Sequence, residues 1–113
     1  MLEACGLLAG IDCFRAERFY PMTNIDRSGE HFSMNLQEQL AVIKDMCRRK
    51  LRMIGIWHSH PAGPPGMTRE DLRLAFTPGV FYVILSLQSE SSPVMAAFQV
   101  RNGKEVKVPC RVG

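Results

Sequence analysis

The chain has 113 residues, of which 46% are hydrophobic and 22% charged, and its formal net charge is +3. These values are ordinary for a soluble globular protein and predict one domain over residues 1–113. No apolar run approaches the ~20 residues that cross a bilayer, and the N-terminus lacks the basic segment of a secretory signal. We therefore expect a cytoplasmic protein with no membrane partner. In that compartment the scattered cysteines should be buried thiols: Cys5, Cys13, Cys47 and Cys110.

The start of the chain predicts a hairpin. Residues 3–9 and 13–20 have strand-like composition and flank a short turn that contains Gly10. Residues 31–35 are expected to add a short strand. Antiparallel strands at the N-terminus would form the first part of a sheet.

A long helix follows. Asn35 and Glu38 match a capping box, with Asn35 as the N-cap and Glu38 at the third helical position. Apolar residues then recur at helical spacing and form one apolar face: Leu36, Leu40, Ile43 and Cys47. The helix should end near Arg49.

The densest basic run of the chain comes at that helix end and comprises Arg48, Arg49, Lys50 and Arg52. Such a run can bind nucleic acid, but no aromatic residues interleave it for base stacking. Cations at a helix C-terminus are favoured by the helix dipole, and we prefer this interpretation. We expect no nucleic-acid partner.

The second half of the chain predicts more of the sheet. Its strands are expected at residues 51–57, 80–87, 94–101 and 104–109. The apolar residues 80–87 are rich in β-branched and aromatic side chains, which favours a central strand. Asn102-Gly103 is the strongest short hairpin signal. Residues 69–76 have room only for a short helix, so the prediction is an α/β or α+β domain with a mixed sheet, one long helix and one short helix.

The stretch HSHPAGPPGMTRED, residues 58–71, carries the chemistry. His58 and His60 stand at i and i+2, so in an extended segment their side chains leave the same face and can reach one ion. Pro61 stops the strand, and the Pro/Gly-rich loop can bring Asp71 back to the same ion. Two histidines and one carboxylate leave a fourth tetrahedral zinc position for water, which marks catalytic zinc sites.

Each part of this pattern also has a simpler interpretation. Thr68 and Asp71 form a capping box, and an aspartate is favoured in a first helical turn. A histidine at a strand end is commonly only hydrogen-bonded. The combination of HxHP with a hydroxyl and an aspartate at this spacing favours the metal site. We interpret His31 as a surface or hydrogen-bonding histidine.

These residues resemble the JAMM (MPN-plus) metalloprotease family. Its motif is an upstream glutamate, then H-x-H-P, with a serine and an aspartate spaced as H-x7-S-x2-D. His58 and His60 match the histidines, Asp71 the aspartate and Thr68 the serine, while EACGLLAG resembles the glutamate segment, with Glu3 as the glutamate. The resemblance covers nearly the whole chain, including FYPMTN in the hairpin and EHFSMN before the long helix.

The resemblance implies a cytidine-deaminase-like α/β fold that binds Zn²⁺ through His58, His60 and Asp71. Glu3 would take a proton from the attacking water and pass it to the leaving amine, and the Thr68 hydroxyl would help to hold the oxyanion. Threonine in place of serine can donate the same hydrogen bond, although its methyl group takes space. The family places a helix before the glutamate segment, and because this chain lacks it, apolar sheet surface should be left uncovered.

The scissile bond in this family is an amide, usually after the C-terminal Gly-Gly of a ubiquitin-like protein. Only eight residues separate Asp71 from Val80, too few for an insertion that grips ubiquitin, so the chain resembles the compact prokaryotic type. Those members are implicated in processing ubiquitin-like sulfur carriers of the ThiS/MoaD kind, and one branch frees cysteine from a carrier adduct. General isopeptidase action ranks second. Other hypotheses are a metal-free MPN-type scaffold and a zinc-stabilised binding module. The second predicts a closed site with a fourth side-chain ligand; no cysteine is near residues 58–71 in sequence, although Cys5 could approach in space.

Overall fold

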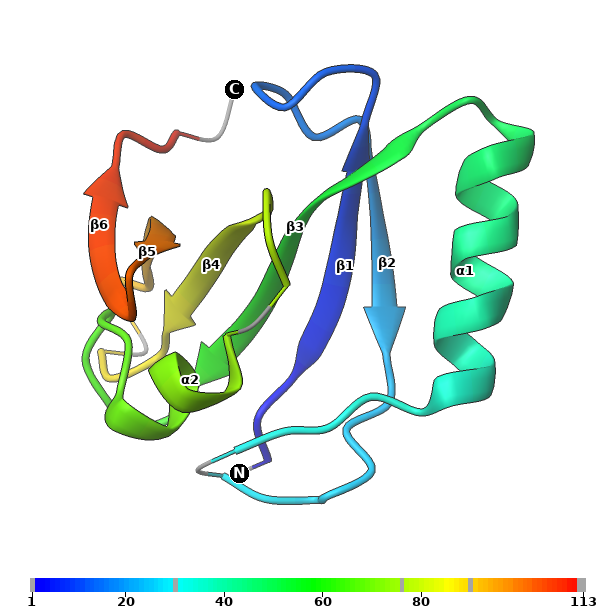
Figure 1. Ribbon diagram of the computed structural model, residues 1–113. Coiled ribbons are helices and arrows are strands. Elements are labelled where there is room, and N and C mark those ends of the chain that lie inside the picture. The colour runs from blue at the N-terminus through cyan, green and yellow to red at the C-terminus, as the bar shows by residue number, and fades with distance from the viewer. Residues whose placement is uncertain (1, 30, 76, 90, 112–113) are drawn as a thin grey trace.

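The computed structural model of the chain describes residues 2–29, 31–75, 77–89 and 91–111. The elements are, in chain order, β1 (Cys5–Gly10), β2 (Arg18–Met22), α1 (Leu36–Arg48), β3 (Arg52–His60), α2 (Arg69–Leu74), β4 (Phe81–Ser86), β5 (Val94–Arg101) and β6 (Lys104–Val108). The strands form one six-stranded sheet in the order β2-β1-β3-β4-β5-β6 (Figure 1). Strands β3 and β4 are parallel and the other neighbours antiparallel, so the mixed sheet is confirmed.

The predicted elements are present, with two differences in the first half. The predicted first hairpin forms, but strands β1 and β2 are joined by a longer loop than expected, over residues 11–17. The short strand predicted at residues 31–35 is reduced to a single bridge between Met34 and Asn24. The C-terminal hairpin is as predicted, because Asn102 and Gly103 both adopt positive φ, 53° and 74°, which suits a tight turn between twisted strands. No helix in the described ranges is long and apolar enough to cross a membrane.

Helix α1 packs on one face of the sheet, as Figure 1 shows. Met46 is its fully buried residue, and it contacts a cluster built from alternate residues of the neighbouring strands. The buried members of this cluster are Cys5, Leu7, Ala9, Tyr20, Met22 and Met46. The N-cap is Asn35, whose side chain accepts a hydrogen bond from the Glu38 N–H at 3.0 Å, and the C-cap is Arg49, so both predicted helix ends are confirmed.

The apolar face predicted for this helix does not meet the sheet. Leu36, Leu40 and Ile43 are 68%, 51% and 43% exposed, and Cys47 is exposed as well. The helix is oriented instead by Met46 and by polar contacts on the sheet side: the Glu38 carboxylate accepts two hydrogen bonds from Thr23, each 2.8 Å long. Helical periodicity identified the helix, but these contacts decide which side of it faces the core.

Both helices lie on the same face of the sheet. His58 on β3 is the cross-strand neighbour of Cys5 under α1 and also touches Asp71 of α2. On the opposite face the rings of Phe19 and Trp57 meet with centroids 4.9 Å apart, and no helix within the described ranges covers them.

The expectation of buried cysteines was wrong for most of them. Only Cys5 is buried, Cys13 is half-buried, and Cys47 and Cys110 are exposed; all four are free thiols. Burial raises the pKa of the Cys5 thiol to about 11, so this thiol stays protonated at neutral pH.

The basic run at the end of α1 is partly neutralised by one carboxylate. Asp45 pairs with Arg48, with Arg49 at 2.8 Å and with Arg18 on β2 at 3.8 Å. The Tyr20 hydroxyl donates a hydrogen bond to the same carboxylate at 2.6 Å. These contacts, led by the Tyr20 hydrogen bond, lower the pKa of Asp45 to about 2.

This cluster predicts a specific loss of stability in acid. Because the pKa of Asp45 is lower in the folded state than its ordinary value of 3.8, the cluster stabilises the fold above about pH 4 and loses this effect as the pH falls toward 2. Replacing Tyr20 by Phe should destabilise the protein at neutral pH, and its difference from wild type should shrink between pH 4 and pH 2. Urea unfolding at several pH values measures this.

Tyr82→Phe is the matched control. The Tyr82 hydroxyl is bonded to the main chain of Thr77, at 3.1 Å from the N–H and 3.3 Å from the carbonyl, and not to a carboxylate. Its destabilisation should therefore be constant over the same pH range. Equal pH dependence of the two variants would contradict the assignment to Asp45.

Candidate metal centre

The two histidines of the HxH motif lie within strand β3, which extends three residues beyond the predicted end at residue 57. His58 and His60 leave the same face of the strand, as predicted, and are 2% and 6% exposed. Their Nε2 atoms are 3.0 Å apart. Parallel pairing with β4 continues through His60 and Ser86, so a central strand pair fixes the backbone under both rings.

Asp71 reaches the histidines from helix α2. Its Oδ1 lies 3.2 Å from Nε2 of His58, and its Oδ2 lies 3.1 Å from Nε2 of His60. The capping box is also present: Asp71 Oδ2 accepts from the Thr68 N–H, and Thr68 Oγ1 accepts from the Asp71 N–H, both at 3.0 Å. The two interpretations of Asp71 are therefore compatible, since the cap fixes the carboxylate beside the histidines.

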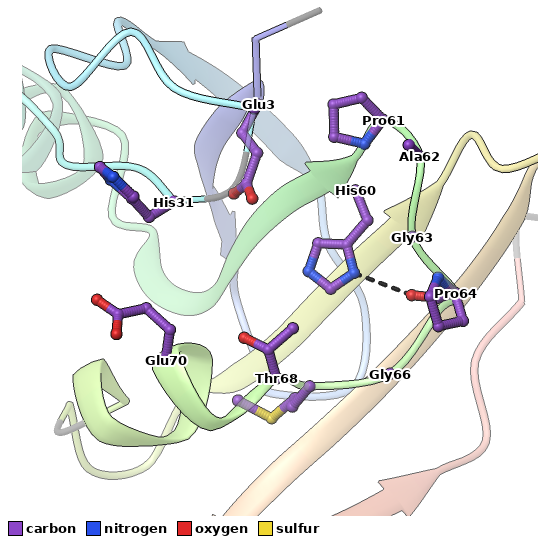
Figure 2. A pocket seen from close by; sticks show the side chains of 12 residues that line it. Glu3, His31, His60, Pro61, Ala62, Gly63, Pro64, Gly66, Thr68 and Glu70 are labelled. Atoms are coloured by element: carbon purple, nitrogen blue, oxygen red, sulfur yellow. Dashed lines mark hydrogen bonds between the residues drawn. The ribbon is translucent and has the colours of Figure 1, made fainter.

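The loop between β3 and α2 sets the orientation of His60. A carbonyl can only accept, so His60 Nδ1 donates to the Pro64 carbonyl at 2.9 Å, the contact drawn in Figure 2. The loop is held in turn by Ser86, whose hydroxyl donates to the Gly63 carbonyl at 2.6 Å. With its proton on Nδ1, neutral His60 keeps the lone pair of Nε2 free for a metal ion, which is the tautomer that a metal ligand requires. Only His60 protonated on both nitrogens can donate from Nε2 to Asp71, 3.1 Å away.

These three side chains fit a metal ion. One ligand atom from each of His58, His60 and Asp71 lies within 4.8 Å of the other two, and all three residues are buried. Lone pairs of imidazole and carboxylate brought this close repel one another unless a cation, either a proton or a metal ion, lies among them. Two nitrogens and one oxygen are a donor set that zinc accepts. Among the described residues, Cys5 is not part of this group, and its thiol donates to the Met22 carbonyl at 3.7 Å.

The pKa values of the metal-ligand group follow from the close contact between Asp71 and the two histidines. Burial alone would raise the pKa of Asp71, but hydrogen bonds from His58 and His60 keep that pKa well below its ordinary value. The hydrogen bond to Asp71 raises the pKa of His60. The carboxylate is therefore ionised at neutral pH and favours a positive charge at this place.

Glu3 lies two residues before the start of β1 and lines the same cavity as His60 and Thr68 (Figure 2). Its side chain is 2% exposed, and Oε1 has no hydrogen-bond partner among the residues that the structure describes. Burial raises the pKa of Glu3, although the nearby histidines, His58 above all, oppose this effect. A buried carboxylate with an unpartnered oxygen beside a candidate metal site is able to accept a proton.

The cavity in front of the metal group has a volume of about 700 Å³. One wall is the loop of residues 61–66, and the opposite wall carries His31 and Glu70 (Figure 2). His31 was not predicted to lie here, because no spacing pattern connects it to residues 58–71. As expected, His31 is hydrogen-bonded, with Nδ1 3.0 Å from Asp26 Oδ2. Phe32, next to it, stacks on the ring of His58 at a centroid distance of 4.7 Å.

The chain matches the family described as prokaryotic homologs of the JAB domain over residues 1–101. The chain belongs to this prokaryotic JAB family. It is also 33% identical over 111 residues to proteins named CysO-cysteine peptidase from Mycobacterium tuberculosis and Mycobacterium bovis, which covers 97% of this chain and 76% of each relative. The resemblance drawn from the sequence motif is confirmed.

Solved structures agree with membership of the JAB family. A protein from Desulfitobacterium hafniense, solved in solution, matches with a TM-score of 0.83 and 42% identity, covering 95% of this chain and 75% of that chain. A JAB1/MPN domain protein from Archaeoglobus fulgidus matches with a TM-score of 0.55 and 22% identity, over 92% of this chain and 75% of that one, which bears on the fold alone. The α/β fold of the JAB domain is confirmed, whereas the relation to cytidine deaminases stays a prediction.

Proposed function

We propose that this JAB domain is a zinc metallopeptidase that hydrolyses an amide bond at the C-terminus of a ubiquitin-like sulfur-carrier protein. The observation that carries the proposal is the convergence of three buried ligand atoms beside the unpartnered carboxylate of Glu3. The relatives named CysO-cysteine peptidase support a carrier–cysteine adduct as the substrate class.

His58, His60 and Asp71 would hold the zinc ion. They provide three protein ligands, so tetrahedral coordination leaves one position for a small molecule, which argues for a catalytic rather than a structural site. When bound, zinc would supply Lewis acidity, polarising the scissile carbonyl and lowering the pKa of a coordinated water to about 7. The capping box and the Pro64 carbonyl keep Asp71 and His60 oriented toward the ion.

Glu3 is the proposed proton carrier. It would accept a proton from the attacking water and deliver it to the nitrogen of the leaving amine. Its raised pKa, caused by burial, suits this exchange, because a group that both accepts and donates a proton works best when its pKa is near the operating pH. Its position on the cavity wall faces the place where the amide must bind.

Thr68 is the proposed oxyanion donor. Its Oγ1 accepts a hydrogen bond from the Asp71 N–H, which leaves the hydroxyl proton available to donate. Thr68 lines the cavity close to His60, so the donated hydrogen bond can reach an oxygen that becomes negative during amide hydrolysis. The methyl group of threonine restricts its rotation, which helps to fix this direction.

The zinc content of protein purified without added metal or chelator tests the metal, and cleavage tests the substrate. We expect about one zinc per chain, and we expect a sulfur carrier with a C-terminal cysteine adduct to be cleaved faster than the same carrier joined to a lysine side chain. Loss of activity after chelation, and its return when zinc is added, would show that cleavage depends on the bound zinc. A zinc content near zero that added zinc does not raise would favour the metal-free scaffold.

A further inference from the structure

One side chain organises the loop of residues 24–29 and 31–33, which we call the Asn24 loop. Asn24 is 9% exposed, and its amide nitrogen donates to the carbonyls of Glu3 and His31, each at 3.1 Å, with Ser28 further away at 3.4 Å. Its Oδ1 accepts from the N–H groups of two loop residues, Asp26 at 3.1 Å and Ser33 at 3.2 Å. A single buried amide therefore uses its donors and its acceptor to join the loop to the residue proposed as proton carrier.

Glu3 depends on this loop for its position. It precedes β1, which begins at Cys5, so strand pairing does not hold it. The Glu3 N–H donates to the Ser28 carbonyl at 2.7 Å, and the Glu3 carbonyl accepts from Asn24. The strand side secures only the next residue: the Ala4 N–H donates to the Ser59 hydroxyl at 2.8 Å, and the Ser59 N–H donates to the Ala4 carbonyl at 2.9 Å.

We propose that Asn24 is a positioning residue for Glu3. The inference rests on the proposed function, in which Glu3 carries the proton. Proton transfer requires heavy atoms within about 3 Å, and a displacement of ~1 Å can lower a rate ~100-fold. Because the same amide also holds the main chain of His31, Asn24 fixes the main chain of Glu3 relative to the cavity wall opposite the 61–66 loop.

The sharpest variant is Asn24→Asp, which has the same size and keeps the acceptor for Asp26 and Ser33 but loses every hydrogen bond that the amide nitrogen donates. Asn24→Ala removes all of them and serves as the second variant. Asn35→Ala is the matched control, since the hydrogen bond that it removes at the N-cap of α1 comes from the Glu38 N–H and involves neither Glu3 nor His31. Each protein is studied with zinc bound, by kinetics on the carrier adduct and by NMR amide hydrogen exchange.

We expect Asn24→Asp to keep its zinc, to lower kcat about 10- to 100-fold with little change in KM, and to exchange the Glu3 amide proton faster than wild type. Asn35→Ala should change none of these quantities. An unchanged kcat, an equally protected Glu3 amide, or zinc loss parallel to the activity loss would each overturn the proposal. Should the wild type cleave no carrier adduct, the proposed substrate falls, while amide exchange still decides whether Asn24 holds Glu3.

Discussion

Glu3→Gln should bind zinc as the wild type does and lose turnover by roughly 10²- to 10⁴-fold, the range that general acid–base catalysis contributes. Glutamine has the shape of glutamate and fits the same buried place, but its amide cannot accept the proton of the attacking water. None of the candidate metal ligands is changed by the substitution. The expected result is therefore a protein that binds zinc but does not cleave the substrate.

The measurement pairs zinc content with kcat on the carrier adduct. Glu17→Gln is the matched control, because it makes the same chemical change at an exposed residue whose carboxylate lies 3.7 Å from Arg15, outside the cavity. Full turnover in Glu3→Gln with zinc bound would show that another group is the base. Loss of zinc would instead show that Glu3 is needed for metal binding.

The same variant should not be less stable than the wild type. Burial disfavours the charge of Glu3, and Oε1 has no partner in the described part of the chain that would compensate. Removing the charge removes this penalty, so the free energy of unfolding should stay equal or rise. A variant that gains stability while it loses activity is typical of a residue kept for chemistry rather than for the fold.

The local signals in the sequence predicted most of the fold. Capping at Asn35 and the Asn102-Gly103 turn each depend on a few neighbouring residues, and both are present. Which side of α1 meets the sheet was not predictable in this way, because Leu36 and Leu40 have the apolar spacing of a buried face and are exposed. That choice depends on contacts between residues far apart in the chain.

The candidate metal group was predictable because its members lie within fourteen residues, from His58 to Asp71, on a strand, a short loop and a helix start. Glu3 was found only through the family resemblance. Asn24 and the place of His31 on the cavity wall were missed, since the Asn24 loop has neither helical nor strand periodicity. Its conformation is set by side-chain to main-chain hydrogen bonds, which leave no pattern in a single sequence.

Asp71→Asn and Asp71→Ala should separate the two roles of that carboxylate. Asparagine keeps an oxygen that can accept from the Thr68 N–H, so the capping box survives in part, but it loses the negative charge that faces His58 and His60. Changes in residues that merely support metal ligands lower affinity ~10- to 100-fold. Because Asp71 is itself a candidate ligand, we expect both variants to lose at least ~100-fold in zinc affinity.

The two variants should differ in stability. Asp71→Ala removes the side chain that reaches back to the N-cap of α2, and losing a capping interaction costs about 1 kcal/mol. Asp71→Asn should lose less stability than Asp71→Ala, as measured by urea unfolding with chelator present. Competition against a zinc chelator measures the zinc affinity of each variant. Unchanged zinc affinity in both variants would leave Asp71 as a helix cap only, and the remaining two histidines would be too few for a catalytic zinc site, which uses three protein ligands. If both variants lose zinc affinity but Asp71→Ala loses more stability, the same carboxylate both caps the helix and binds the ion. Folding of α2 would then itself complete the metal centre.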